Sequence, residues 1–273
     1  MEKPNRERKT EIKAINAVQL NDEQKEAKRL IVENQIVIVT GRAGSGKSLV
    51  CAQAALDFLK KKQISCIYNT RAAVEVGKSL GFLPGALNEK FDPYMEALVE
   101  NLNKCCQDKN EVQKLIQDEK IKALPVQFIR GKTVDDILIV EEAQNLTKTE
   151  MLAILTRLGK TGKIVINGDN EQTDIKSASG EMNGLTYAIE LSKKIEEIKQ
   201  KNEPSFSYEV FIEYPDKQEE KKMDLSKLYN AGFKVYDVKD ARRHLPPARS
   251  VVDRSEEHTS ELQSRGLISY AVF

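Results

Sequence analysis

The stretch from residue 35 to residue 48, QIVIVTGRAGSGKS, constrains the fold more than any other part of the sequence. It begins with the apolar β-branched run 36–39, which is typical of a buried parallel strand. It then becomes a glycine-rich turn, and residues 49–59 after the turn have the pattern of a helix. Glycines allow successive backbone N–H groups to face one anion, and the positive end of the helix faces the same point. The stretch therefore predicts a strand, a phosphate-binding loop and a helix.

The spacing of this turn, Gly-x-x-x-x-Gly-Lys-Ser, predicts how it binds a nucleotide. Lys47 is expected to reach the β- and γ-phosphates, and the Ser48 hydroxyl is expected to bind Mg²⁺. The alternative is a glycine-rich turn without a ligand, which the strand before the turn and the helix after it disfavour. The residues expected to contact the nucleotide in this stretch are Gly41, Arg42, Ala43, Gly44, Ser45, Gly46, Lys47, Ser48 and Leu49.

The composition fits an α/β domain of ordinary size and indicates no membrane segment. The chain has 273 residues, of which 40% are hydrophobic and 31% charged, and no apolar run approaches membrane-spanning length. Because the net charge is only +1, any affinity for nucleic acid must come from local patches. The four cysteines, Cys51, Cys66, Cys105 and Cys106, lack metal-ligand spacing, so we expect reduced thiols in a cytoplasmic protein.

Both ends of the chain are expected to lie outside the folded domain. Residues 1–19 begin with the basic stretch MEKPNRERKTEIK, which is expected to be a mobile arm that is either solvated or in contact with RNA phosphates. Residues 254–273 contain RSEEHTSELQS and ISYAVF, which resemble the translation of a common sequencing adapter, with a natural polar tail as the alternative. We therefore expect a single domain over residues 20–253.

Strand patterns alternate with helix patterns along the chain, which predicts a mostly parallel sheet with helices on both faces. The expected strands are 36–39, 65–69, 137–140, 163–167, 206–214 and 233–238, with a further strand or extended segment over 123–130. The expected helices are 22–33, 49–59, 93–106, 110–121, 147–158 and 183–201.

Polar groups follow three of the predicted strands, including the strand before the phosphate loop, and ligands of open α/β sheets bind at the carboxyl ends of strands. Glu141 is expected to hold Mg²⁺ together with Ser48, and Glu142 is the candidate base for the water that attacks the γ-phosphate. Gln172 is the candidate sensor of that phosphate. The alternatives are a solvated acidic turn for the two glutamates and an ordinary loop residue for Gln172.

A site that hydrolyses a nucleotide also needs a cation that stabilises the charge of the transition state. The sequence alone does not choose among the arginines, and an exposed surface arginine is the ordinary alternative for each of them. The candidates are Arg42, Arg71, Arg130, Arg242 and Arg243.

Five stretches resemble the PhoH family of P-loop ATPases: GRAGSGKS, SLGFLPGALNEKFDPYMEAL, FIRGKTVDDILIVEEAQNLT, MLAILTRLGKTGKIVINGD and ARRH. The resemblance covers about residues 20–246 and implies a RecA-like core, with strand 163–167 between the phosphate-loop strand and the Glu141 strand. It also implies that Gln24 binds the adenine, that Gln172 is a sensor and that Arg243 is the catalytic arginine.

The sequence departs from the family pattern at two positions and in the segment 203–232, which is longer than the resemblance leads us to expect. Ala72 replaces a usual proline, which loosens the loop after Arg71. Glu141 replaces a more frequent aspartate, and its longer arm alters the spacing to the metal.

Together these features predict ATP hydrolysis with Mg²⁺, and the resemblance adds coupling to RNA or single-stranded nucleic acid in a helicase-like activity. The alternative is a nucleotide-dependent binding or regulatory module with negligible hydrolysis. A small-molecule kinase is disfavoured, because a water-activating carboxylate beside the metal ligand would waste ATP. Since one core domain cannot form the two-lobed cleft of a helicase, we expect a homo-oligomer with sites at its interfaces.

Overall fold

The computed structural model describes residues 18–72, 92–172, 182–200, 228, 230–231 and 233–238. The chain divides into two compact units, Met1–Asp240 and Ala241–Phe273, and all described residues belong to the first. The adapter-like tail, the predicted strand 206–214 and nearly all of the N-terminal arm lie outside the described residues. The domain bounds 20–253 therefore stay a prediction.

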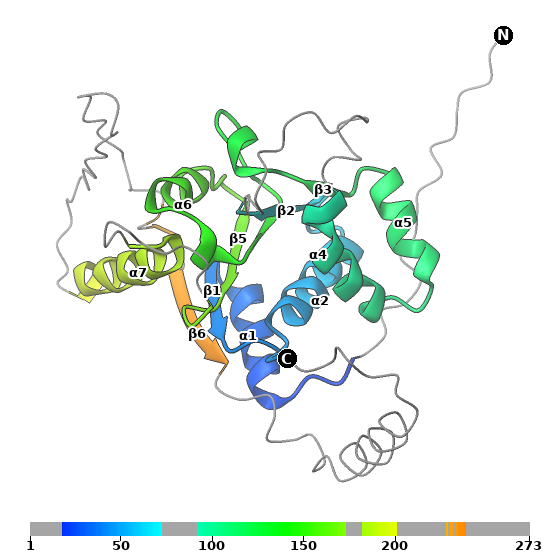
Figure 1. Ribbon diagram of the computed structural model, residues 1–273, viewed down its shortest axis with the longest axis horizontal. Coiled ribbons are helices and arrows are strands. Elements are labelled where there is room, and N and C mark those ends of the chain that lie inside the picture. Colours follow the sequence, from blue (N-terminus) through cyan, green and yellow to red (C-terminus); the bar gives the residue numbers. More distant parts are fainter. Residues whose placement is uncertain are drawn as a thin grey trace, which may run out of the picture. The chain divides into compact units, whose positions relative to one another are not determined.

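The described strands form one parallel sheet in the order β3-β2-β4-β5-β1-β6 (Figure 1). The central strands consist mostly of isoleucine and valine, which suit a pleated surface covered on both faces. Because β5 lies between β1 and β4, the strand order is the one expected for a RecA-like core, and the predicted fold class is confirmed. The strands are β1 Ile36–Gly41, β2 Ile67–Arg71, β3 Ile121–Ala123, β4 Ile137–Glu141, β5 Lys163–Gly168 and β6 Phe233–Val238.

Helices cover both faces of the sheet (Figure 1). One face packs Val37 and Val39 of β1 against α1 Asp22–Glu33, α2 Lys47–Lys60, α4 Asp92–Cys105 and α5 Lys109–Gln117. The alternate residues of β1, Ile36 and Ile38, face the other layer, which contains α6 Lys148–Leu155, α7 Gly184–Gln200 and the short 3₁₀ turns η1 Val126–Phe128 and η2 Ala143–Asn145. The period of two in each strand thus builds two separate hydrophobic cores.

The predicted strand or extended segment over 123–130 was wrong in most of its length. β3 ends at Ala123, and the chain then enters the 3₁₀ turn η1. Pro125 precedes that turn and has no N–H to donate to a neighbouring strand, so the ladder cannot continue through it.

The predicted helix 110–121 was also too long, because α5 ends at Gln117. Glu119 adopts a left-handed backbone with φ of 56°, and the Lys120 N–H donates back to the Leu115 carbonyl at 2.8 Å. This reversal closes the helix in the manner of a left-handed C-terminal cap and lets residue 121 begin β3.

Candidate functional site

The loop between β1 and α2 has the backbone geometry that its glycines require. Gly46, the N-cap residue of α2, has a φ of 84°, and a Cβ atom there would lie 2.5 Å from Nε2 of Gln24. Lys47 is the first residue of α2, and its ammonium donates to the carbonyls of Gly41 at 2.6 Å and Arg42 at 3.0 Å. The loop thus wraps the N-terminus of α2 with an ammonium group beside it, which is the arrangement of an anion-binding turn.

Burial lowers the pKa of Lys47, while the nearby carboxylates of Asp169 and Glu142 oppose this shift. Desolvation disfavours the charged ammonium, and a negative neighbour favours it. An anion bound at the loop would act in the same direction as those carboxylates.

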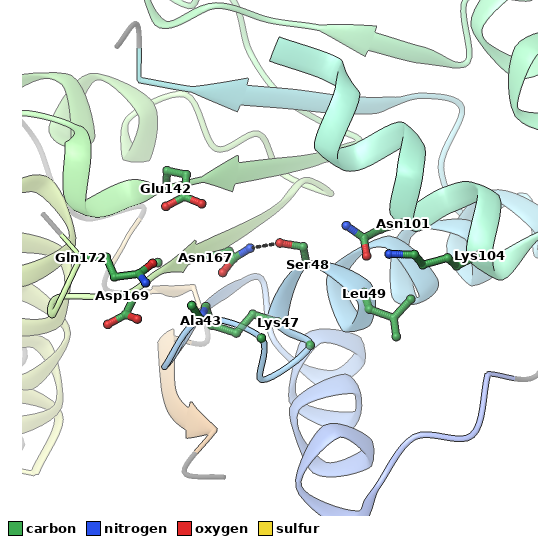
Figure 2. A pocket seen from close by; sticks show the side chains of 13 residues that line it. Ala43, Lys47, Ser48, Leu49, Asn101, Lys104, Glu142, Asn167, Asp169 and Gln172 are labelled. Atoms are coloured by element: carbon green, nitrogen blue, oxygen red, sulfur yellow. Dashed lines mark hydrogen bonds between the residues drawn. The ribbon is translucent and has the colours of Figure 1, made fainter. Parts of the chain in front are cut away.

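A cavity of about 380 Å³ lies in front of the loop (Figure 2). Its lining comes from the loop, the first turn of α2, the carboxyl ends of β4 and β5, and α4. The residues are Ala43, Gly44, Gly46, Lys47, Ser48, Leu49, Asn101, Lys104, Glu142, Asn167, Gly168, Asp169 and Gln172. The structure therefore brings the predicted residues Lys47, Glu142 and Gln172 to one cavity.

Ser48 has a partner that the sequence analysis did not single out. The buried amide Nδ2 of Asn167 donates to the Ser48 hydroxyl at 2.8 Å (Figure 2). Asn167 is the polar residue near the end of the otherwise apolar strand β5, and that break in the apolar run was the signal for it. The bond fixes the direction of the hydroxyl oxygen.

Glu141 is the last residue of β4, opposite Arg71 in the register of β2, and only 3% of it is exposed. Neither carboxylate oxygen makes a hydrogen bond of full geometry with the described residues, although the side chains of Asn69 and Ser48 lie close to it. Burial raises the pKa of Glu141, and the nearby side chains of Asn69, Arg71 and Ser48 oppose this shift. A buried carboxylate without a hydrogen-bond partner is costly unless a cation lies beside it.

These donors fit Mg²⁺. Magnesium prefers oxygen ligands, usually one or two carboxylates together with phosphate oxygens and waters. The buried oxygens of Glu141 and the oriented hydroxyl of Ser48 provide such a partial set. In the described part of the chain no cluster of three or more His, Cys, Asp or Glu residues forms a complete protein cage, so phosphate and water would supply the remaining ligands.

Glu142 lies at the start of a hydrogen-bonded cluster centred on Gln144. Its backbone is left-handed, with φ of 51° and ψ of 46°, which is a strained conformation for glutamate. The fully buried amide of Gln144 donates to the Glu142 carboxylate at 2.6 Å and to the Gln172 carbonyl at 3.2 Å, and it accepts from the Asp169 N–H at 3.0 Å. A Cβ on Gly168 would lie 2.7 Å from Gln144 Oε1, so any other residue there would displace the Gln144 amide.

Gln144 belongs to the EEAQN motif, but nothing in the sequence pattern assigned it a role of its own. Its contacts join the ends of β4 and β5, which are separated by more than twenty residues of sequence. The position of these strands side by side, and not any local pattern, makes Gln144 a neighbour of both.

The predicted arginines lie in different places. Arg42 is 80% exposed and its Nε lies 3.5 Å from a carboxylate oxygen of Glu171, so it points along the surface. Arg71 ends β2, Arg130 is exposed after η1, and neither is among the residues that line the cavity. Arg242 and Arg243 lie outside the described residues. The positively charged residues that line the cavity are Lys47 and Lys104, and Lys104 was not predicted.

Gln24 lies in the first turn of α1, as predicted. Its Nε2 donates to the Ser45 carbonyl at 3.0 Å, and its Oε1 accepts from the Asn21 N–H at 3.1 Å in a capping box. Both ends of the amide therefore bind the protein itself, beside Gly46.

Comparisons with known proteins agree with the sequence motifs. The family model for PhoH-like proteins matches residues 16–202. The chain belongs to the PhoH family. This confirms the resemblance that the motifs indicated.

Relatives in this family include the PhoH-like protein of Mycobacterium bovis, which is 40% identical over 187 residues, or 68% of this chain and 52% of that protein. The PhoH-like protein of Bacillus subtilis is 39% identical over 64% of this chain and 54% of its own length. Protein PhoH of Escherichia coli K12 is 34% identical over 62% of this chain and 48% of its own length. The chain thus matches about half the length of these curated relatives.

Similar solved structures are more distant. Pif1 helicase from Candida albicans has a TM-score of 0.32 and 15% identity, with 57% of this chain and 34% of that chain covered. The flagellar accessory protein FlaH from Methanocaldococcus jannaschii has a TM-score of 0.26 and 14% identity, with 51% of this chain and 63% of that chain covered.

None of the helices in the described residues is long and apolar enough to span a membrane.

Proposed function

We propose that this PhoH-family chain binds ATP with Mg²⁺ and hydrolyses it. The convergence of four groups on one edge of the sheet supports this proposal: Lys47 at the phosphate loop, Ser48 beside Asn167, buried Glu141, and Glu142 across the cavity. Hydrolysis needs a held triphosphate, a metal and a base near the attacking water, and these residue types can supply each.

In this proposal each residue has one role. Backbone N–H groups of the loop and the Lys47 ammonium bind the phosphates, and Ser48 and Glu141 hold Mg²⁺. Glu142 takes a proton from the attacking water, and Gln172 contacts the γ-phosphate or that water. Mg²⁺ supplies charge neutralisation of the phosphate oxygens when it is bound.

We further propose that hydrolysis is coupled to RNA or single-stranded nucleic acid and occurs in a homo-oligomer. Family membership supports the first part, since the chain resembles helicase-like ATPases. The single sheet of the described residues supports the second part, because one such core does not by itself form the two-lobed cleft of a helicase. Arg243, from the same or a neighbouring subunit, is the proposed catalytic arginine.

The experiment is a measurement of phosphate release from Mg²⁺-ATP with and without RNA, for the parent protein, Glu142→Gln and Lys47→Ala. Glu142→Gln should keep ATP binding by calorimetry and lose on the order of 10²-fold in rate, because a positioned base is removed. Lys47→Ala should lose detectable binding. Glu197→Gln, an exposed change on α7, is the matched control and should match the parent.

A second candidate function is a nucleotide-dependent binding module with negligible hydrolysis. The strained backbone of Glu142 and its bond to Gln144 favour it, because a carboxylate held by a donor is a weaker base. Parent protein that binds ATP but releases no phosphate above the Glu142→Gln rate, with or without RNA, would support this candidate over the first.

A further inference from the structure

The cavity has a wall that neither the phosphate loop nor the strand ends account for. Asn101 and Lys104 of α4 line it beside Ser48 and Leu49, while Glu142, Asp169 and Gln172 line the opposite side (Figure 2). Residues three apart on a helix share a face, so the two α4 side chains form one polar surface. One wall is thus acidic and the other presents an ammonium and an amide.

α4 is held firmly enough to place these two side chains. Leu98, Leu102 and Cys105 are fully buried in the core on the α2 side of the sheet, and α4 packs directly against α2. Since α2 begins at the phosphate loop, packing against it fixes the distance between the α4 face and the loop. The Asn101 amide Nδ2 donates to the Ala97 carbonyl at 2.8 Å, one turn earlier on the helix, which restricts its rotamer.

The charges that line the cavity favour a second cation beside a bound nucleotide. Lys47 already donates to two loop carbonyls, and two carboxylates, Glu142 and Asp169, line the same space. A Mg²⁺-bound triphosphate remains an anion, so it would meet repulsion from those two carboxylates. A cation on the opposite wall offsets this repulsion.

Lys104 can provide this second cation, because its ion pair with Glu100 is weak. Its Nζ lies 2.7 Å from Glu100 Oε1, and the side chains are 55% and 67% exposed. An exposed i, i+4 ion pair contributes little to stability, because water screens it and two side chains must be ordered to form it. Charge-assisted bonds to phosphate oxygens in a partly enclosed cavity are stronger, so a bound nucleotide would compete successfully with Glu100.

We propose that Lys104, together with the Asn101 amide, binds the phosphate chain of the nucleotide and is a second affinity-determining cation of the site. The proposal deepens the function proposed above and depends on nucleotide binding in this cavity. The ligand class is the polyphosphate, whatever the base, because the α4 residues lie beside the helix that presents the phosphate-binding N–H groups.

The test is calorimetric titration of the full chain with Mg²⁺-ATP and Mg²⁺-GTP at fixed ionic strength. Lys104→Ala should weaken both nucleotides by a similar factor of about tenfold, as expected for loss of one charge-assisted bond. Lys104→Arg should retain affinity to within about threefold, because it keeps the charge. The difference between parent and Lys104→Ala should shrink as salt is raised, since the lost contact is electrostatic.

Two variants separate phosphate binding from a structural effect on α4. Glu100→Gln breaks the same ion pair but leaves the ammonium, so it should bind nucleotide at least as tightly as the parent. Lys122→Ala removes a lysine from a comparable exposed pair, 2.7 Å from Glu119 and away from the cavity, and should change nothing. A loss in Glu100→Gln equal to that in Lys104→Ala would overturn the proposal.

Other outcomes distinguish the failure of this proposal from failure of the function itself. If the parent binds ATP, Lys47→Ala does not and Lys104→Ala matches the parent, the site stands and Lys104 has no part in it. If Lys104→Ala loses affinity for single-stranded RNA but not for nucleotide, its phosphate partner is nucleic acid and the proposal is wrong. If the parent binds no Mg²⁺-nucleotide, both proposals are wrong.

Discussion

The amide of Asn167 donates a 2.8 Å hydrogen bond to the hydroxyl oxygen of Ser48, and this bond joins the end of β5 to the first turn of α2. The donor occupies one lone pair of the hydroxyl and leaves the other for a metal ion. Asn167 thus acts on the proposed Mg²⁺ site through the orientation of Ser48.

Asn167→Ala should raise the Mg²⁺ concentration needed for half-maximal ATP binding by about threefold to tenfold, the usual range for one lost hydrogen bond. Nucleotide titrations at several Mg²⁺ concentrations measure this. Asn34→Ala is a control, because the Asn34 amide makes a bond of 2.9 Å to the Leu30 carbonyl at the end of α1. An unchanged Mg²⁺ requirement in Asn167→Ala would show that the bond does not act on the metal.

Gln144→Met should lower both stability and turnover. The change keeps the side-chain volume but removes three hydrogen bonds and leaves the Asp169 N–H without its acceptor, so a loss of about 1–3 kcal/mol is expected. The rate at saturating ATP should fall further than the affinity, because the Gln144 amide positions the Glu142 carboxylate and the loss of that position outweighs the gain in basicity from removing a donor. Thermal melting and steady-state kinetics measure the two effects.

Gln53→Met separates these effects. Gln53 is also buried, but its amide joins α1 and α2 by accepting from Lys28 at 3.1 Å, away from the strand ends. It should lose stability without loss of the maximal rate. Equal kinetic effects in both variants would mean that Gln144 acts only through the fold.

The fold could be predicted from the sequence because its signals are local. Apolar runs such as 137–140 and the glycine-rich turn after β1 each act within a few residues. The position of β5 between β1 and β4 was expected from the family resemblance and not from these local signals. The two errors in element bounds lie where a single residue ends a strand or a helix. Pro125 cannot continue the strand ladder, and Glu119 adopts a left-handed backbone after α5. No periodicity marks such a turn in advance.

The site was predictable only in part, for a physical reason. Lys47, Ser48 and Glu142 belong to local sequence motifs from which their roles can be predicted, and all three line the cavity. Gln144 and Lys104 lie at the site because strands and helices pack side by side, a relation that a single sequence does not contain. Arg243 and its role stay a prediction, since it lies outside the described residues.

Glu141→Gln should stabilise the protein in the absence of Mg²⁺ and nucleotide at pH 8. The folded-state pKa of Glu141 is raised by burial, so the unfolded chain ionises first as pH rises above about 4.5. The free energy of unfolding therefore falls as pH rises through the window between about 4.5 and the raised pKa, and above that window the loss stays constant. The variant avoids this cost, and its melting temperature should exceed that of the parent by about 2 °C or more.

Melting temperatures measured at lower pH and with Mg²⁺-ATP test whether the stability difference between Glu141→Gln and the parent arises from ionisation of Glu141. The advantage of Glu141→Gln should shrink as pH falls from the raised pKa toward about 4.5, and it should vanish below that pH, where the parent carboxyl is protonated in both states. Mg²⁺-ATP should raise the melting temperature of the parent more than that of the variant, because the variant lacks the metal ligand. A parent that melts higher at pH 8 without ligand would mean that Glu141 is already compensated within the protein.

The last prediction concerns Gln24 and the choice of base. Family resemblance implies that the Gln24 amide hydrogen-bonds to adenine. In the structure, however, its Nε2 donates to the Ser45 carbonyl at 3.0 Å and its Oε1 accepts from the Asn21 N–H. These contacts support the loop directly beside Gly46, whose missing Cβ leaves room for Nε2. Gln24→Ala should therefore weaken ATP and GTP binding by a similar factor of about threefold to tenfold, as expected for one lost loop contact. Gln113→Ala, an exposed change on α5, is the control and should bind both nucleotides like the parent. Loss of ATP binding alone, with GTP unchanged, would mean that the amide leaves the loop to read adenine.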